Sequence, residues 1–158
     1  MNKTAIKNFA VWARNKLIAD ISYKASLLGV TEAGINAALP QSTKDVEFYD
    51  IGTKEPYAIT GEALRQRKQL AERIAQKAKE SDYKTAYRSV LEEVAYTWFN
   101  RLIAIRFMEV NDYLPSRIRV LSSESGTKLE PDLVTTPFEA GLALSDYDKA
   151  EIVRLKTE

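Results

Sequence analysis

Arg106 and Glu109 are the two residues whose types and spacing most suggest chemistry, because they interrupt the most apolar stretch of the sequence. At 100° per residue both point into the apolar arc of a helix, and residues three apart can form an ion pair along it. Burying two charges is costly unless each satisfies the other. We therefore expect a structural ion pair in which both residues are at least half buried, with a functional site at the same place as the alternative.

Basic residues that could contact nucleic-acid phosphates are concentrated in two segments, although the net charge is only +1. Residues 1–30 hold five basic groups against one acid, and residues 62–80 hold six against three, whereas residues 121–158 are acidic. Lysine and arginine on a helix suit phosphate contact. The candidates are Lys3, Lys7, Arg14, Arg65, Arg67 and Lys68. The alternative is that these residues form the solvated flanks of two helices.

Catalytic chemistry is poorly supported, because the sequence contains neither histidine nor cysteine. These residues are the commonest general acid–base group, thiol nucleophile and zinc ligands. A nuclease pattern would place Pro-Asp before an acid-x-Lys pair, but Pro131-Asp132 follows Asp82-Tyr83-Lys84. Adjacent acids such as Glu92-Glu93 diverge on a helix. We expect no catalytic residue, no cofactor-binding residue and no metal site in this chain.

A long helix over about 89–114 must position the Arg106–Glu109 pair, and we expect it to be the buried centre of the fold. One face carries apolar residues at helical spacing: Leu91, Val94, Ala95, Trp98, Leu102 and Ile105. The stripe is widened to more than half the circumference by Phe99, Ile103, Phe107 and Val110. Ser89 followed by Glu92 is typical of a capping box, and Leu114-Pro115 predicts the end of the helix.

The N-terminal segment predicts another long helix, over about 5–28. Thr4 can cap its start, and Gly29 is placed to end it in a left-handed conformation. Residues 31–39 predict one or two further helical turns, ended by Pro40.

The middle of the chain changes pattern and predicts a small β hairpin. Residues 46–51 are β-prone, and residues 57–59 can return as the second strand. A helix over about 61–80 should follow, and a short helix over 82–88 should lead into the central one. The alternative is that the short helix and the central helix form one kinked helix, since Ser89 permits either. The fold class is therefore mainly α, with one small β hairpin or ribbon.

The C-terminal segment predicts less regular structure. Residues 117–121 alternate charged and apolar side chains like a short strand. Ser145 followed by Asp148 resembles a capping box that opens a helix to about Lys156. No helix-ending signal follows, so we expect the chain to continue in a longer protein.

Length and composition fit a single domain spanning residues 1–158. Apolar residues make up 45% of the sequence, and no apolar run approaches the length of a transmembrane helix. The lack of cysteine fits a cytoplasmic protein, and we expect no membrane partner.

The run YTWFNRLIAIRFMEVNDYLPSRIRVLSS, residues 96–123, closely resembles the N-terminal region of the PglX family. These proteins are the adenine-specific DNA methyltransferases of BREX-type bacterial phage-exclusion systems. Three other segments resemble the same family: residues 2–14, 29–40 and 49–66. The resemblance covers nearly the whole chain. The segment NRLIAIRFME is also similar to a helix that precedes the catalytic domain of other large adenine DNA methyltransferases.

The resemblance implies a parent enzyme that transfers a methyl group from S-adenosylmethionine to an adenine amine in phage defence. Such an enzyme needs a glycine-containing turn for the cofactor. It also needs adjacent prolines after a polar residue, followed by an aromatic residue, to hold the flipped adenine. Here the six glycines never occur as G-x-G, and the five prolines are never adjacent. We therefore expect this segment alone to be inactive, with S-adenosylmethionine bound elsewhere in the parent.

These observations favour a non-catalytic N-terminal domain that scaffolds the methyltransferase. The partners implied by the resemblance are the catalytic domain of the same chain, double-stranded DNA and other proteins of the phage-exclusion system. The alternative is a protein–protein interaction module, or a free-standing regulator, without nucleic-acid contact.

Overall fold

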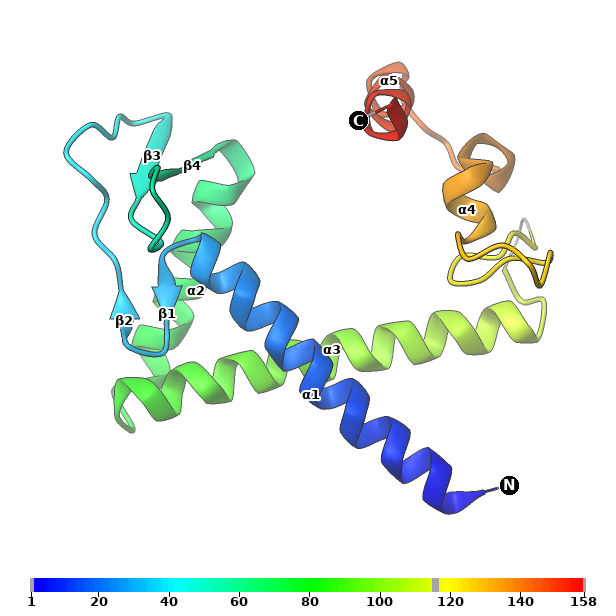
Figure 1. Ribbon diagram of the computed structural model, residues 1–158, viewed down its shortest axis with the longest axis horizontal. Coiled ribbons are helices and arrows are strands. Elements are labelled where there is room, and N and C mark those ends of the chain that lie inside the picture. The colour runs from blue at the N-terminus through cyan, green and yellow to red at the C-terminus, as the bar shows by residue number, and fades with distance from the viewer. Residues whose placement is uncertain (1, 115–116, 158) are drawn as a thin grey trace. The chain divides into compact units, whose positions relative to one another are not determined.

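The computed structural model describes residues 2–114 and 117–157 (Figure 1). It is mainly α with small antiparallel β elements, as the sequence predicts. The chain divides into two compact units between Asn100 and Arg101, inside the long helix α3. Within the described residues, none of the helices combines the length and the apolar character needed to span a bilayer.

Helix α1, Lys3–Leu27, begins two residues earlier than expected. Its N-cap is Asn2 and not Thr4, because the Asn2 side chain accepts a hydrogen bond from the backbone N–H of Ala5 at 3.1 Å. The predicted end is confirmed, since Gly29 follows the helix with φ +67°.

The next segment forms a hairpin, so the expected further helical turns are wrong. Strands β1, Val30–Thr31, and β2, Gly34–Ile35, pair antiparallel. The Thr31 hydroxyl donates to the carbonyl of Gly34 at 3.1 Å, which closes the turn locally. Asn36 N–H donates back to the carbonyl of Gly29 at 2.8 Å. These bonds give the backbone an alternative to a helix, which a glycine at position 34 already disfavours.

The second hairpin is confirmed. Strands β3, Val46–Tyr49, and β4, Tyr57–Thr60, pair antiparallel with Tyr49 opposite Tyr57. Tyr49 and Ile59 are the buried residues of this ribbon.

Two helices complete the first unit. Helix α2 spans Gly61–Lys77, and α3 spans Tyr83–Val110 as one continuous helix. Asp82 caps α3, because its side chain accepts the backbone N–H of Thr85 at 3.0 Å and the Thr85 hydroxyl at 2.6 Å. The expected capping box at Ser89 is therefore wrong, since Ser89 lies within the helix, and the alternative of one helix holds.

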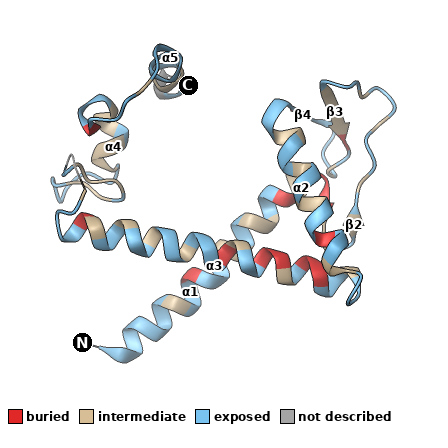
Figure 2. Ribbon diagram, turned by 180° about the vertical axis from the view of Figure 1, so that it is seen from behind, coloured by how far each residue is buried: buried red, intermediate tan, exposed pale blue. Residues whose placement is uncertain are grey.

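Burial is concentrated in the first half of α3, which corrects the expectation of a helix buried throughout. The core of the first unit joins the end of α1 and β1 to α2 and the start of α3 (Figure 2). Its buried residues are Ala25, Val30, Ile74, Ala86, Tyr87, Val90 and Leu91. Farther along α3, Trp98, Phe107 and Val110 are 48–60% exposed. The apolar periodicity shows which face avoids water, but not how far its neighbours extend.

A single arginine of α2 ties both hairpins to the end of α1. Arg67 donates to the carbonyl of Leu28 at 2.9 Å and to the carbonyl of Asn36 at 2.6 Å. Its guanidinium also lies 4.1 Å from the centre of the Tyr49 ring, in cation–π geometry. Gly29 makes room for this ring, because a Cβ there would lie 3.0 Å from it.

The second unit begins with the C-terminal part of α3 and is less regular. Residues 117–121 form no strand; the carbonyl of Arg119 instead accepts the N–H of Leu133 at 2.9 Å. Helix α4 spans Asp132–Thr135, the 3-10 helix η1 spans Pro137–Ala140, and α5 spans Asp146–Thr157.

The capping box that opens α5 is confirmed. The N–H of Asp148 donates to the Ser145 hydroxyl, and the N–H of Ser145 donates to the Asp148 carboxylate, both at 3.1 Å.

Gly29→Ala should destabilise the protein by about 2–4 kcal/mol, because it combines a left-handed backbone with a clash against Tyr49. Gly52→Ala is the matched control. Gly52 also has positive φ but has no atom near its missing Cβ, so only backbone strain of about 1–2 kcal/mol is expected. Urea unfolding measures both variants. Equal losses would show that Tyr49 does not press on this position.

Candidate functional site

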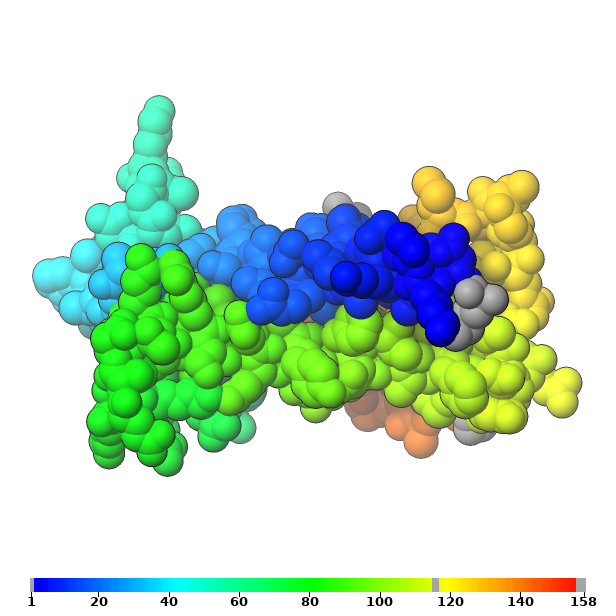
Figure 3. Space-filling model, turned by 90° about the horizontal axis from the view of Figure 1, so that it is seen from below, coloured from blue at the N-terminus to red at the C-terminus, as the bar shows by residue number. Residues whose placement is uncertain are grey.

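An apolar groove of about 500 Å³ lies beside the contact of α1 with α3 in the first unit. Figure 3 shows α1 lying against this part of α3. Ala10 of α1 and Ala95 of α3 line the groove together with Tyr96 and Phe99. Small side chains on both helices allow the two backbones to approach closely, so the larger aromatic residues form the walls.

A row of three aromatic rings continues from the groove onto α1. The rings of Phe99 and Phe9 are 6.4 Å apart, and those of Phe9 and Trp12 are 6.0 Å apart. Phe9 is half exposed, Trp12 is 62% exposed, and Tyr96 at the groove is 69% exposed. We call Trp12, Phe9 and Phe99 the aromatic row. Contiguous exposed apolar surface of this kind marks interaction sites.

The charged residues at the groove are already paired. Arg14 donates to Glu92 at 2.7 Å across the rim. Glu93 accepts from Lys77 and, at 3.3 Å, from Arg73. The hydrogen bond from Lys77, supported by Arg73, holds the pKa of Glu93 below its usual range. Glu93 is therefore ionised at neutral pH, and its charge is balanced within the unit.

The six candidate phosphate contacts do not form one surface. Lys3, Lys7 and Arg14 belong to the first half of α1, which lies away from α2 (Figure 1). On α2, Arg65 and Lys68 are exposed beside Lys44, which precedes strand β3. Both side chains lie within 4.0 Å of a glutamate of their own helix. Exposed pairs of this kind are weak, so a phosphate can compete for these cations.

Arg67 differs from the other five candidates, because its guanidinium is engaged by two carbonyls and the Tyr49 ring. Burial, with a further contribution from the hydrogen bond to Glu47, raises the pKa of Tyr49 to about 12. The ring therefore stays neutral and its face remains available to the arginine.

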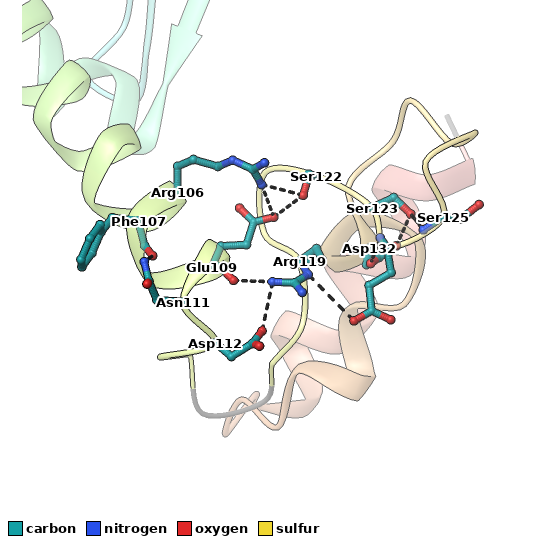
Figure 4. Close-up of polar contacts among 11 residues, drawn as sticks. Arg106, Phe107, Glu109, Asn111, Asp112, Arg119, Ser122, Ser123, Ser125 and Asp132 are labelled. Atoms are coloured by element: carbon teal, nitrogen blue, oxygen red, sulfur yellow. Dashed lines mark hydrogen bonds and ion pairs between the residues drawn. The ribbon is translucent and has the colours of Figure 1, made fainter. Parts of the chain in front are cut away.

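The structure brings Arg106 and Glu109 together in the second unit, within a polar cluster (Figure 4). Arg106 Nη1 lies 3.2 Å from Glu109 Oε1 and donates to the Ser122 hydroxyl at 2.9 Å. The same hydroxyl donates to Glu109 Oε1. Glu109 is fully buried, as expected, but the expectation of at least half burial is wrong for Arg106, whose side chain is 51% exposed. The pair holds the segment around Ser122 against the end of α3.

Arg119 is a second link of this cluster that sequence reasoning missed. It donates to the backbone carbonyl of Glu109 and lies 3.1 Å from Asp112 and 3.9 Å from Glu124 (Figure 4). Its alternation with apolar neighbours suggested a strand, and no local signal identified a partner on α3.

Asp132 closes the loop that follows. It accepts from the Ser123 hydroxyl at 2.6 Å and from the N–H of Glu124 at 2.9 Å. The bond from Ser123 is the main cause that lowers the pKa of Asp132. The hydrogen bonds of ionised Asp132 therefore stabilise the folded loop fully at pH values above the ordinary pKa of an aspartate. This stabilisation is lost as the pH falls through the lowered pKa of Asp132.

We call the cluster of Arg106, Glu109, Arg119 and Ser122 the clasp, because its contacts hold the segment after α3 against the end of that helix. Glu109 Oε2 is buried with no hydrogen-bond partner, which fits a residue held for packing at some energetic cost. Among residues 2–114 and 117–157, no group of three acidic side chains is arranged to hold a metal ion. The groove and the aromatic row are the surfaces with binding character, and they were missed because apolar periodicity alone indicated burial.

Arg106→Ala should lower the opening free energy of this loop by about 1–3 kcal/mol, because a buried carboxylate loses its cation while half of the arginine was solvated. Hydrogen exchange of the amides of Asp132 and Leu133, which bond back to Ser122 and Arg119, measures the opening. Lys149→Ala breaks an exposed pair of the same spacing and should leave exchange unchanged. Native exchange rates in Arg106→Ala would contradict the clasp.

No protein-family model matches the chain. The adenine-specific methyltransferase PglX of Lacticaseibacillus casei (strain Zhang) is 47% identical over 151 residues, which cover 96% of this chain and 12% of that protein. The adenine-specific methyltransferase BrxX of Escherichia coli O9:H4 (strain HS) is 33% identical over 157 residues, covering 99% of this chain and 12% of the relative.

The chain thus spans 12% of the length of the curated relatives that it matches. The resemblance to PglX predicted from the sequence is confirmed: over nearly its whole length the chain is similar to one segment of the adenine-specific methyltransferases PglX and BrxX.

Proposed function

We propose that this chain is the non-catalytic N-terminal domain of an adenine-specific DNA methyltransferase. The observation that carries the proposal is the 47% identity over 96% of the chain to a segment that makes up 12% of PglX. The sequence contains no G-x-G pattern and no adjacent prolines, which supports the non-catalytic assignment.

In this proposal the domain scaffolds the catalytic part of the same polypeptide. The parent enzyme would bind S-adenosylmethionine, methylate an adenine amine of double-stranded DNA and act in the cytoplasm in phage defence, together with other proteins of the exclusion system. The first unit suits a scaffold, because one core and the Arg67 contacts join its helices to both hairpins.

Calorimetric titration of the 158-residue chain with S-adenosylmethionine should give no saturable heat, and the chain should not methylate DNA. The reason is that the sequence has neither a G-x-G pattern for the cofactor nor adjacent prolines to hold the adenine. A chimera in which the chain replaces the matched 151 residues of L. casei PglX is the positive control. The chimera should methylate DNA, whereas PglX with this segment deleted should not. Micromolar binding by the chain alone would move a cofactor site into it.

We further propose that the domain contacts DNA phosphates through the exposed cations of α2, Arg65 and Lys68, with Lys3 and Lys7 as secondary contacts. Arg14 is left out, because Glu92 already neutralises it at the groove. Arg67 is left out, because its guanidinium already holds both hairpins. Contacts with phosphates position a protein on DNA without reading its sequence.

The double reversal Arg65→Glu with Lys68→Glu should weaken DNA binding by the chimera and lower the slope of log affinity against log salt by about 2, one unit for each lost phosphate contact. Fluorescence anisotropy at several salt concentrations measures both quantities. The double variant Lys149→Glu with Arg154→Glu changes the net charge equally on α5 and serves as the control. The same loss in both variants would indicate only a general charge effect and would remove α2 from consideration.

A further inference from the structure

The groove and the aromatic row are apolar surfaces that the core of the first unit does not use. The buried cluster joins α2, β1 and the ends of α1 and α3 that lie nearest to them. Trp12 and Tyr96 remain more than 60% exposed, and Phe9 remains half exposed. Water contact with this much aromatic surface is unfavourable, and aromatic residues are the commonest anchors of protein interfaces.

The charges around the groove argue against nucleic acid as its occupant. Arg14 is neutralised by Glu92, and Glu93, which also lines the groove, is paired with Lys77 and Arg73. A phosphate placed here would face two carboxylates, whereas stacking of bases on aromatic residues normally comes with a cationic groove. An uncharged, apolar protein segment meets no such penalty.

We propose that the groove and the aromatic row bind an apolar segment from the remainder of the same methyltransferase polypeptide. This inference rests on the proposed function, because the proposed partner lies in the part of the methyltransferase outside the matched segment. The matched segment makes up only 12% of each relative. A segment tethered in the same chain has an effective concentration on the order of millimolar. A shallow apolar groove between two helices then suffices for stable docking, in the manner of an amphipathic helix that inserts its apolar face.

Cysteine accessibility tests the proposal directly, because the chain itself contains no cysteine. Tyr96→Cys places a thiol at the groove, and Tyr23→Cys places one on α1 outside it; the two tyrosines are 69% and 64% exposed. In the 158-residue chain both thiols should react with N-ethylmaleimide at similar rates. In the chimera with L. casei PglX, the Tyr96→Cys thiol should react at least tenfold more slowly, while the Tyr23→Cys thiol keeps its rate. Peptide mass spectrometry distinguishes these thiols from any others in the chimera.

Trp12→Cys provides a second probe on the aromatic row, in case Tyr96→Cys does not fold, and should be protected in the same way. Equal rates at the groove and at position 23 in a methylating chimera would overturn docking and leave the proposed function standing. A chimera that does not methylate would count against the proposed function, whatever the thiols do. Protection that grows with protein concentration would assign the groove to a second copy and overturn the proposal. Equal protection of both thiols would also overturn it, by placing the interface outside the groove.

Discussion

The first unit depends on one guanidinium. Arg67 of α2 donates to the carbonyl of Leu28 at the end of α1 and to the carbonyl of Asn36 at the end of the β1–β2 hairpin. Its guanidinium also lies over the Tyr49 ring of β3. Two-stranded ribbons are marginal without support, and the contacts of Arg67 add to the apolar core in which Ala25 and Val30 are buried. A planar group that donates at its edge and stacks at its face can satisfy all three at once, which an ammonium cannot do.

The second unit solves a similar problem with a buried carboxylate. The segment after α3 has almost no regular hydrogen bonding, so Glu109, Arg106, Arg119 and Ser122 replace a ladder with side-chain contacts. Such a clasp is more dependent on single residues than a sheet is, because each removed partner leaves another polar group unsatisfied.

What the sequence could predict was local. Helix periodicity, the Gly29 stop and the Ser145 capping box act over a few residues, and the structure contains all of them. The β1–β2 hairpin depends on a hydrogen bond from the N–H of Asn36 to the carbonyl of Gly29. No sequence pattern in residues 31–39 predicts this bond. The spacing of Arg106 and Glu109 indicated their pairing. Ser122 lies 13 residues farther along an irregular segment, so its role followed only from the structure. Periodicity also could not show that the apolar face of α3 extends beyond the elements that bury its first half.

The exposure of the tryptophan side chains determines what intrinsic fluorescence measures in this protein. The chain has two tryptophans, Trp12 and Trp98, and neither belongs to the core around Ile74 and Val90. Trp12 is 62% exposed and Trp98 is 48% exposed, so the intrinsic emission should shift less on unfolding than that of a buried tryptophan. The emission of Trp12 follows the aromatic row, so a blue shift of this emission on assembly marks burial of the row, whereas circular dichroism follows folding.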